Sequence, residues 1–198
     1  MSRQQRNPVK RQLPFALTTL RLLLGPIALG LAFGNAPRWL FLPLLVAGTL
    51  SDIFDGILAR RLGMATPALR RYDSITDVIY YLFILGTLWR LCHDVVRENL
   101  WAVAVILASE AAAILVCAVK FGKYPATHSW LAKFYGLCLL GGLIALLAFD
   151  AGNWAVVTLA IVAAVTNAEI ILLHLLAKTP PVDVPSIFHW RKRQKTGE

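Results

Sequence analysis

Hydrophobic positions along the chain form six long runs, which are separated by shorter polar connections. The runs cover residues 14–34, 39–59, 75–91, 100–119, 130–149 and 153–177. Each run has about the length, roughly 20 mostly apolar residues, that an α-helix needs to cross the hydrocarbon core of a bilayer. The pattern therefore predicts an all-α polytopic membrane protein with six transmembrane helices. We expect residues 14–177 to form the membrane domain, with a basic arm at 1–13 and a basic tail at 178–198.

The composition supports the same fold class. Hydrophobic residues make up 58% of the 198 positions and charged residues only 16%, whereas a soluble domain is about 25% charged. The three cysteines have neither the spacing of a metal site nor the number that a disulfide framework needs. These observations exclude an ordinary soluble domain, a disordered chain and a cysteine-rich scaffold.

Basic residues are distributed unevenly between the two ends of the predicted helices. Sixteen of the 20 Lys and Arg residues lie in the arm, the tail, and the connections after the second and fourth helices. Only Arg38, Arg90 and Arg97 lie in connections on the opposite side. Because cytoplasmic loops carry an excess of Lys and Arg, we expect both termini in the cytoplasm. The formal net charge of +9 is then a consequence of membrane topology, and we expect no nucleic-acid partner.

Four aspartates lie within or at the ends of the predicted second and third helices, where charge is costly. Asp52 and Asp55 are three residues apart, and Asp73 and Asp77 are four apart. Residues at these spacings share one face of a helix. The two pairs flank a short basic connection on the expected cytoplasmic side. If the second and third helices are antiparallel neighbours, we expect the two pairs to converge.

Such a convergence has chemical consequences. Four carboxylates cannot share a small site as anions without cations, and oxygen-only ligands favour Mg²⁺ or Mn²⁺ over zinc. Two ions would suit in-line displacement at phosphorus. Gly56 and Ala59 lack bulk, which would let a ligand approach the helix closely. Arg60 offers a planar fork suited to phosphate.

Seven residues around this connection keep the spacing of a known signature. They are Asp52, Asp55, Gly56, Ala59, Arg60, Asp73 and Asp77, with twelve residues between Arg60 and Asp73. The spacing resembles that of the CDP-alcohol phosphatidyltransferase family. The start of the first predicted helix also resembles the family, with Pro14, Leu17, Thr18 and Arg21 in the usual order.

The resemblance implies a transferase of phospholipid synthesis that moves a phosphatidyl group from CDP-diacylglycerol to an alcohol and releases CMP. It implies that the four aspartates hold the metal ions, with Asp77 also acting as general base on the acceptor hydroxyl. The candidates for binding the nucleotide donor are Gly56, Ala59, Arg60, Thr18 and Arg21. The resemblance further implies a homodimer, and we expect it in a bacterial inner membrane with its active site on the cytoplasmic side.

The acceptor alcohol is left open by these motifs. A phosphorylated acceptor such as glycerol 3-phosphate, as in a phosphatidylglycerophosphate synthase-like enzyme, is the preferred hypothesis. Serine, inositol phosphate, choline and phosphatidylglycerol are the alternatives. A basic patch for a phosphorylated acceptor could be formed by Arg70, Arg71, Lys120, Lys123 and His128. The same residues could instead merely follow the positive-inside rule.

Three positions depart from the family pattern. Leu69 replaces the second signature glycine, Val78 stands where a lysine often follows the last aspartate, and Phe15 stands where an asparagine often follows the first-helix proline. Leu69 matters most, since it could reshape the acceptor pocket or mark an impaired enzyme.

Two other functions stay open at this point. A CDP-choline- or CDP-ethanolamine-type phosphotransferase would keep the family and change the donor. A non-catalytic cation-binding membrane protein or transporter would also carry carboxylates within its helices. We disfavour a transporter because its site tends toward the bilayer midplane, whereas the aspartates here cluster at one membrane face. Arg21 lies within the first helix and needs a partner, which could be the aspartates, donor phosphates or lipid headgroups.

Overall fold

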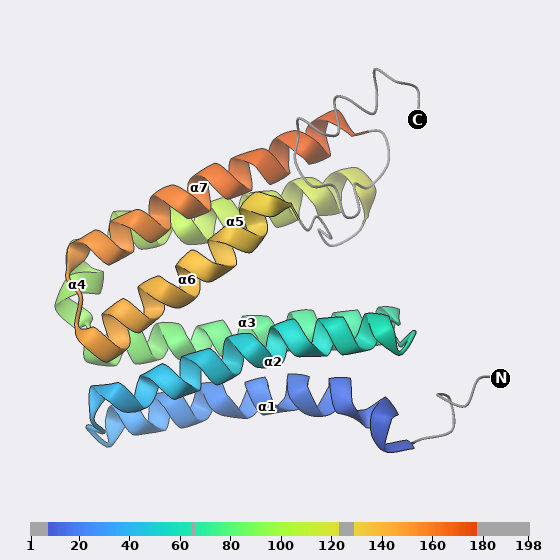
Figure 1. The fold of residues 1–198 in the computed structure, drawn as a ribbon. Helices are drawn as coiled ribbons and strands as arrows, with labels where there is room; N and C mark the ends of the chain where they lie inside the picture. Colours follow the sequence, from blue (N-terminus) through green and yellow to red (C-terminus); the bar gives the residue numbers. More distant parts are fainter. Residues whose placement is uncertain (1–7, 65, 123–128, 178–198) are drawn as a thin grey trace. The chain divides into compact units, whose positions relative to one another are not determined.

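The computed structural model describes residues 8–64, 66–122 and 129–177, and over these ranges the fold is helical without strands (Figure 1). Six helices are long and apolar enough to cross a membrane, as predicted. They are α1 (Pro8–Phe33), α2 (Phe41–Arg61), α3 (Pro67–Leu91), α5 (Leu100–Phe121), α6 (Trp130–Phe149) and α7 (Asn153–Leu176). Two short helices that the sequence did not predict, η2 (Arg38–Leu40) and α4 (His93–Glu98), lie in the connections.

Two of the long helices begin earlier than the hydrophobic pattern predicts. The first begins at Pro8 instead of residue 14, and α3 begins at Pro67 instead of residue 75. Thr66 caps α3 by accepting a hydrogen bond from the backbone N–H of Leu69 at 3.2 Å, and proline is favoured in the first turn of a helix. The first turns of α3 are polar, so hydropathy alone misses them. Asp73 therefore lies inside α3 and shares its face with Asp77.

The helical contacts divide the chain into two units, which are described separately. The first unit comprises Met1–His93 and Leu146–Asp150, and the second comprises Asp94–Ala145 and Ala151–Glu198. In the first unit, backbone contacts are mainly those of α1 with α2 and of α1 with α3 (Figure 1). Helix α1 is thus the element along which both aspartate-bearing helices pack.

Small residues let the helices of the first unit approach closely. A Cβ on Gly48 of α2 would lie 2.5 Å from the hydroxyl oxygen of Tyr80 in α3. A Cβ on Gly25 of α1 would lie 3.1 Å from the side chain of Phe83 in α3. Glycines at helix contacts are a common means of close packing in membrane proteins. These two positions fix the separation of the helices that carry the site.

Polar side chains of different helices pair with one another in the second unit. The side-chain amide of Asn167 in α7 donates to the hydroxyl of Ser109 in α5 at 3.0 Å. The hydroxyl of Tyr135 in α6 is hydrogen-bonded to the carboxyl group of Glu110 in α5. Such bonds between helices satisfy polar groups in the absence of water.

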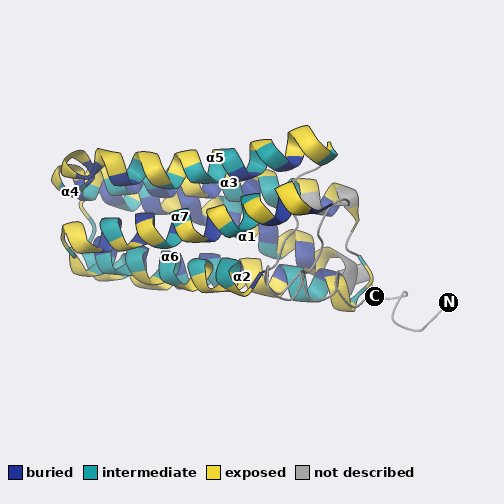
Figure 2. Ribbon diagram, turned by 90° about the horizontal axis from the view of Figure 1, so that it is seen from above, coloured by how far each residue is buried: buried dark blue, intermediate teal, exposed yellow. Residues whose placement is uncertain are grey.

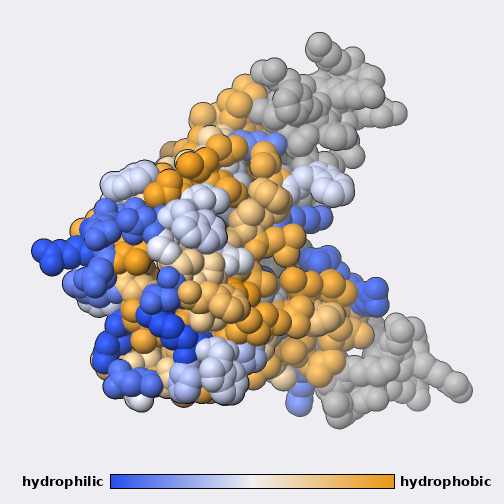
Figure 3. Space-filling view, turned by 60° about the vertical axis from the view of Figure 1, so that its left-hand side comes forward, coloured by the Kyte–Doolittle hydropathy of each residue, from blue (hydrophilic) through white to orange (hydrophobic). Residues whose placement is uncertain are grey.

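The outward faces of the helices carry large hydrophobic side chains in both units. Figure 2 shows exposed residues along every long helix, and many of them are leucine, valine, isoleucine or phenylalanine. In the space-filling view, apolar side chains cover much of the visible helical surface (Figure 3). Exposure of so much apolar surface to water would be unfavourable in free energy. A lipid environment accounts for it, in agreement with the six candidate membrane spans.

Candidate active site

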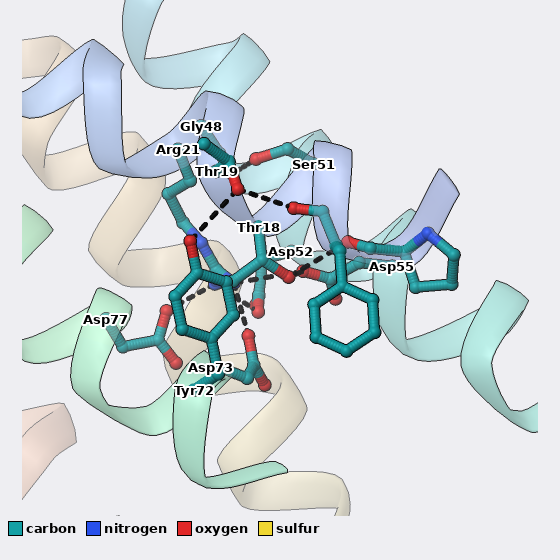
Figure 4. Close-up of polar contacts among 12 residues, drawn as sticks. Thr18, Thr19, Arg21, Gly48, Ser51, Asp52, Asp55, Tyr72, Asp73 and Asp77 are labelled. Carbon is teal, nitrogen blue, oxygen red and sulfur yellow. Dashed lines mark hydrogen bonds and ion pairs between the residues drawn. The ribbon is translucent and has the colours of Figure 1, made fainter. Parts of the chain in front are cut away.

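Side chains from three helices of the first unit meet in one polar cluster. Helix α2 contributes Asp52 and Asp55, α3 contributes Asp73 and Asp77, and α1 contributes Arg21 from between them (Figure 4). The predicted convergence of the two acidic pairs is therefore present. The two acidic pairs meet next to α1, because α2 and α3 both pack along that helix.

The guanidinium group of Arg21 contacts all four aspartates. One terminal nitrogen, Nη1, pairs with Oδ1 of Asp52 and Oδ1 of Asp77. The other, Nη2, pairs with Oδ1 of Asp73 and lies 3.0 Å from Oδ2 of Asp55. The side chain of Arg21 is only 2% exposed. Of the three partners that the sequence left open for Arg21, the structure therefore places it with the aspartates.

The four carboxylates differ in their exposure to the surroundings. The Asp55 side chain is 6% exposed, whereas those of Asp73 and Asp77 are each 35% exposed and that of Asp52 is 49% exposed. Asp55 therefore lies at the bottom of the cluster and Asp52 at its open side. A ligand would reach the cluster from the side of Asp52.

Thr18 forms a hydrogen bond with Asp55 at the buried side of the cluster. Its hydroxyl is fully buried and donates to Oδ2 of Asp55 at 2.9 Å, with the carbonyl oxygen of Pro14 as a second acceptor at 3.0 Å. Thr18 and Arg21 are three residues apart, so one face of α1 supplies both contacts. A hydrogen bond to a charged group is stronger than one between neutral groups. Thr18 therefore orients the most deeply buried carboxylate.

A second polar contact joins α1 and α3 at the edge of the cluster. The hydroxyl groups of Thr19 and Tyr72 lie 2.9 Å apart, and the ring of Phe15 is 6.1 Å from that of Tyr72 (Figure 4). Sequence reasoning did not single out Tyr72, and its position next to Asp73 is the only signal that could have found it. Phe15, one of the departures from the family pattern, packs at this edge.

The donor set of the cluster fits a hard divalent cation. One carboxylate oxygen from each of Asp52, Asp55 and Asp73 can be chosen so that all three lie within 4.8 Å of one another. Oδ1 of Asp77 is buried and has no hydrogen-bond donor among the described residues, although it pairs with the charge of Arg21. Carboxylate oxygens are the ligands that Mg²⁺ and Mn²⁺ prefer. The identity and number of ions stay predictions.

The small and basic residues of the signature follow the aspartates on α2. A Cβ on Gly56 would meet the guanidinium of Arg60 at 3.6 Å, so this arginine lies over the glycine. Arg60 is exposed and Ala59 is buried. The helix surface beside the aspartates thus has no side chain at Gly56 and carries the positive charge of Arg60.

Two of the residues predicted to bind the acceptor have described side chains, one in each unit. Arg71 is exposed near the start of α3, in the first unit. Lys120 belongs to the second unit, where its ammonium group donates to the backbone carbonyl of Leu175 at 2.6 Å. The Arg70 side chain, Lys123 and His128 lie outside the described residues. The acceptor patch therefore stays a prediction.

Leu69 is accommodated without strain. It lies in the first turn of α3, where its backbone N–H binds the Thr66 cap and its side chain is buried. Its backbone is helical, so no left-handed conformation requires a glycine at this position. Val78, by contrast, is exposed on the outer face of α3.

Comparison with known families decides the class of protein. A family model described as CDP-alcohol phosphatidyltransferase matches residues 11–171. The chain belongs to the CDP-alcohol phosphatidyltransferase family. No curated protein and no solved structure gives a significant match.

Membership confirms the resemblance found in the sequence and its coarse consequences. The family consists of transferases for substituted phosphate groups, which transfer a phosphatidyl group from a CDP-alcohol to an alcohol. Members are known to use a divalent metal ion, and the three clustered carboxylates of this chain could bind one. Six apolar helices agree with an integral membrane protein of phospholipid synthesis.

Proposed function

We propose that this protein transfers the phosphatidyl group of CDP-diacylglycerol to glycerol 3-phosphate and releases CMP. The observation that carries the proposal is the convergence of the four aspartates on Arg21. The order of the signature residues supports a CDP-linked donor, and their position beside a basic connection supports a phosphorylated acceptor.

Asp52, Asp55, Asp73 and Asp77 are the proposed ligands of Mg²⁺ or Mn²⁺, with two ions. When bound, such ions supply positive charge that stabilises the attacking and leaving oxygens of a displacement at phosphorus. Support for this assignment comes from the oxygen-only donor set and the short separation of its carboxylate oxygens.

Asp77 is the proposed general base. It would take the proton from the acceptor hydroxyl, whose oxygen then forms a bond with the β-phosphorus of the donor. The bond between that phosphorus and the bridging oxygen breaks, and the electron pair leaves on CMP. The Asp77 side chain is 35% exposed, so an acceptor hydroxyl can reach its carboxylate, which suits proton transfer.

Gly56, Ala59 and Arg60 are the proposed contacts of the CDP moiety. The exposed guanidinium of Arg60 lies over Gly56 and suits a phosphate group that binds next to the aspartates. Thr18 and Arg21 contact the aspartates directly. Their proposed contribution to donor binding is therefore exerted through the carboxylates that they hold.

The remaining assignments concern the acceptor and the cellular setting. Arg70, Arg71, Lys120, Lys123 and His128 are the proposed acceptor contacts, and the protein is proposed to act as a homodimer. The uneven distribution of basic residues supports an active site on the cytoplasmic face of a bacterial inner membrane.

The test is acceptor-dependent CMP release by the purified protein in mixed micelles containing Mg²⁺. CDP-diacylglycerol is offered with glycerol 3-phosphate, serine, inositol phosphate, choline or phosphatidylglycerol, one at a time. We expect release with glycerol 3-phosphate. Release with another acceptor alone would replace the substrate. No release with any acceptor, followed by release from CDP-choline or CDP-ethanolamine with diacylglycerol, would replace the donor.

A further inference from the structure

Arg21 is bound more extensively than a donor-binding residue needs to be. Both terminal nitrogens of its guanidinium are engaged, each with two carboxylates from two different helices. Only Nε lacks a hydrogen-bond partner among the described residues, and it is buried. In this arrangement no terminal nitrogen is left for a phosphate group.

The charges explain why this arrangement is stable. A guanidinium within a helix that crosses a membrane is costly unless it is paired. Four carboxylates brought together are likewise costly unless a cation lies among them. Arg21 and the aspartates therefore compensate one another, and α1 supplies the cation that keeps α2 and α3 together at this point.

A divalent ion bound by these carboxylates would lie close to the guanidinium of Arg21. Mg²⁺ binds carboxylate oxygens at about 2.0–2.1 Å, and the candidate ligand oxygens of Asp52, Asp55 and Asp73 lie within 4.8 Å of one another. The terminal nitrogens of Arg21 already contact one oxygen of each of these groups. The second oxygen of each carboxylate is left for an ion, but an ion bound there would lie close to the guanidinium, and the two positive charges would repel each other.

We propose that Arg21 is an internal competitor of the divalent ion. Its guanidinium holds the four carboxylates together, and it leaves at least two of them when the ion binds. The inference rests on the metal site of the proposed function and adds a positioning role to Arg21. The affinity for the ion is then lower than the carboxylates alone would give, and removal of the guanidinium raises it.

The experiment measures binding of Mn²⁺ alone, without nucleotide, to the full-length protein in detergent. Loss of the free Mn²⁺ signal in electron paramagnetic resonance gives the dissociation constant directly. A charge within about 4–6 Å shifts the pKa of a carboxylate by about 1–3 units, so we expect removal of the guanidinium in Arg21→Gln to lower this constant at least about tenfold. The matched control is Arg61→Gln, which removes the same charge from an exposed position of α2. We expect Arg61→Gln to change the constant less than about threefold, because exposed charges are strongly screened.

A second variant keeps the test decisive if Arg21→Gln does not fold. Arg21→Lys retains the charge but offers one nitrogen instead of two, so it cannot hold four carboxylates in the same way. We expect its affinity for Mn²⁺ to lie between those of the wild type and Arg21→Gln. A folded variant that binds Mn²⁺ no more tightly than the wild type overturns the competition and leaves the proposed transferase intact. If neither the wild type nor any variant binds Mn²⁺, the ion site itself is wrong, and the proposed function loses its metal dependence together with this inference.

Discussion

The first unit buries a guanidinium among four carboxylates, whereas polar side chains of different helices in the second unit form single pairs. In the first, Arg21 meets aspartates from two helices. In the second, Asn167 bonds to Ser109 and Tyr135 bonds to Glu110. Pairs of the second kind are satisfied locally and add stability. A charged cluster costs far more to bury, so its presence points to chemistry.

This difference predicts that the two units respond differently to substitution. Changes in the charged cluster are expected to remove activity from a protein that still folds. Changes at the pairs of the second unit are expected to lower stability while the activity of the folded fraction is kept. The following predictions test the contrast, beginning with the largest effect.

Asp77→Asn is expected to lower kcat by about 100- to 10,000-fold, the range that a general base contributes. The amide cannot take the proton of the acceptor hydroxyl, and it withdraws one charge from the cluster. CMP release at saturating substrate measures the effect. The matched control is Asp94→Asn in the second unit, at an exposed position of α4, and it should keep nearly full activity. Wild-type turnover in Asp77→Asn would contradict the assignment.

Thr18→Ala is expected to lower activity about 10- to 100-fold, which is typical for loss of a residue that orients a metal ligand. The substitution removes the 2.9 Å hydrogen bond to Asp55. Thr18→Ser keeps the hydroxyl and should restore most of the activity. Thr158→Ala in α7 is the control, because that exposed hydroxyl only donates to a backbone carbonyl. Equal activity of Thr18→Ala and Thr158→Ala would show that Asp55 needs no such support.

Gly48→Ala is expected to destabilise the protein by about 1–3 kcal/mol, as overpacking of a close contact does. The added Cβ would lie 2.5 Å from the hydroxyl oxygen of Tyr80 and would push α2 away from α3. Thermal unfolding in detergent measures the loss, and addition of Tyr80→Phe should recover part of it. Gly136→Ala is the control, since a Cβ there meets nothing within 4 Å. Matching melting temperatures for the two alanine variants would refute the close packing.

Asn167→Ala is expected to have the smallest effect, a loss of about 0.6 kcal/mol and no more than about 2 kcal/mol in stability. It breaks the bond to Ser109 at 3.0 Å. The same unfolding assay measures the loss, and CMP release per folded molecule should not change. A large fall in turnover at unchanged stability would show that the second unit takes part in the chemistry.

Much of the fold could be predicted from the sequence because a bilayer requires long apolar helices. The starts of α1 and α3 could not, since their first turns are polar and lack the hydropathy that marks a span. Proline and the Thr66 cap begin α3, and these are local signals that a hydropathy pattern does not contain. The connections also contain short helices, and no apolar run predicts them.

The candidate site, too, could be predicted only in part from the sequence. The spacing of the four aspartates predicts two acidic faces, and those faces do converge. The partner of Arg21 could not be chosen from the sequence, because the choice depends on how α2 and α3 pack along α1. Motif spacing thus predicts what one helix presents and says little about which helices meet.

The most direct test of the central claim is the divalent-ion dependence of acceptor-dependent CMP release in the wild type and in Asp73→Asn. The claim is that the aspartate cluster of the first unit holds the ion that the transfer needs. We predict that EDTA abolishes release by the wild type and that Mg²⁺ or Mn²⁺ restores it. Asp73→Asn should need a much higher ion concentration for half-maximal release, or show no release. Release that persists in EDTA, or an unchanged ion requirement in Asp73→Asn, would contradict the claim.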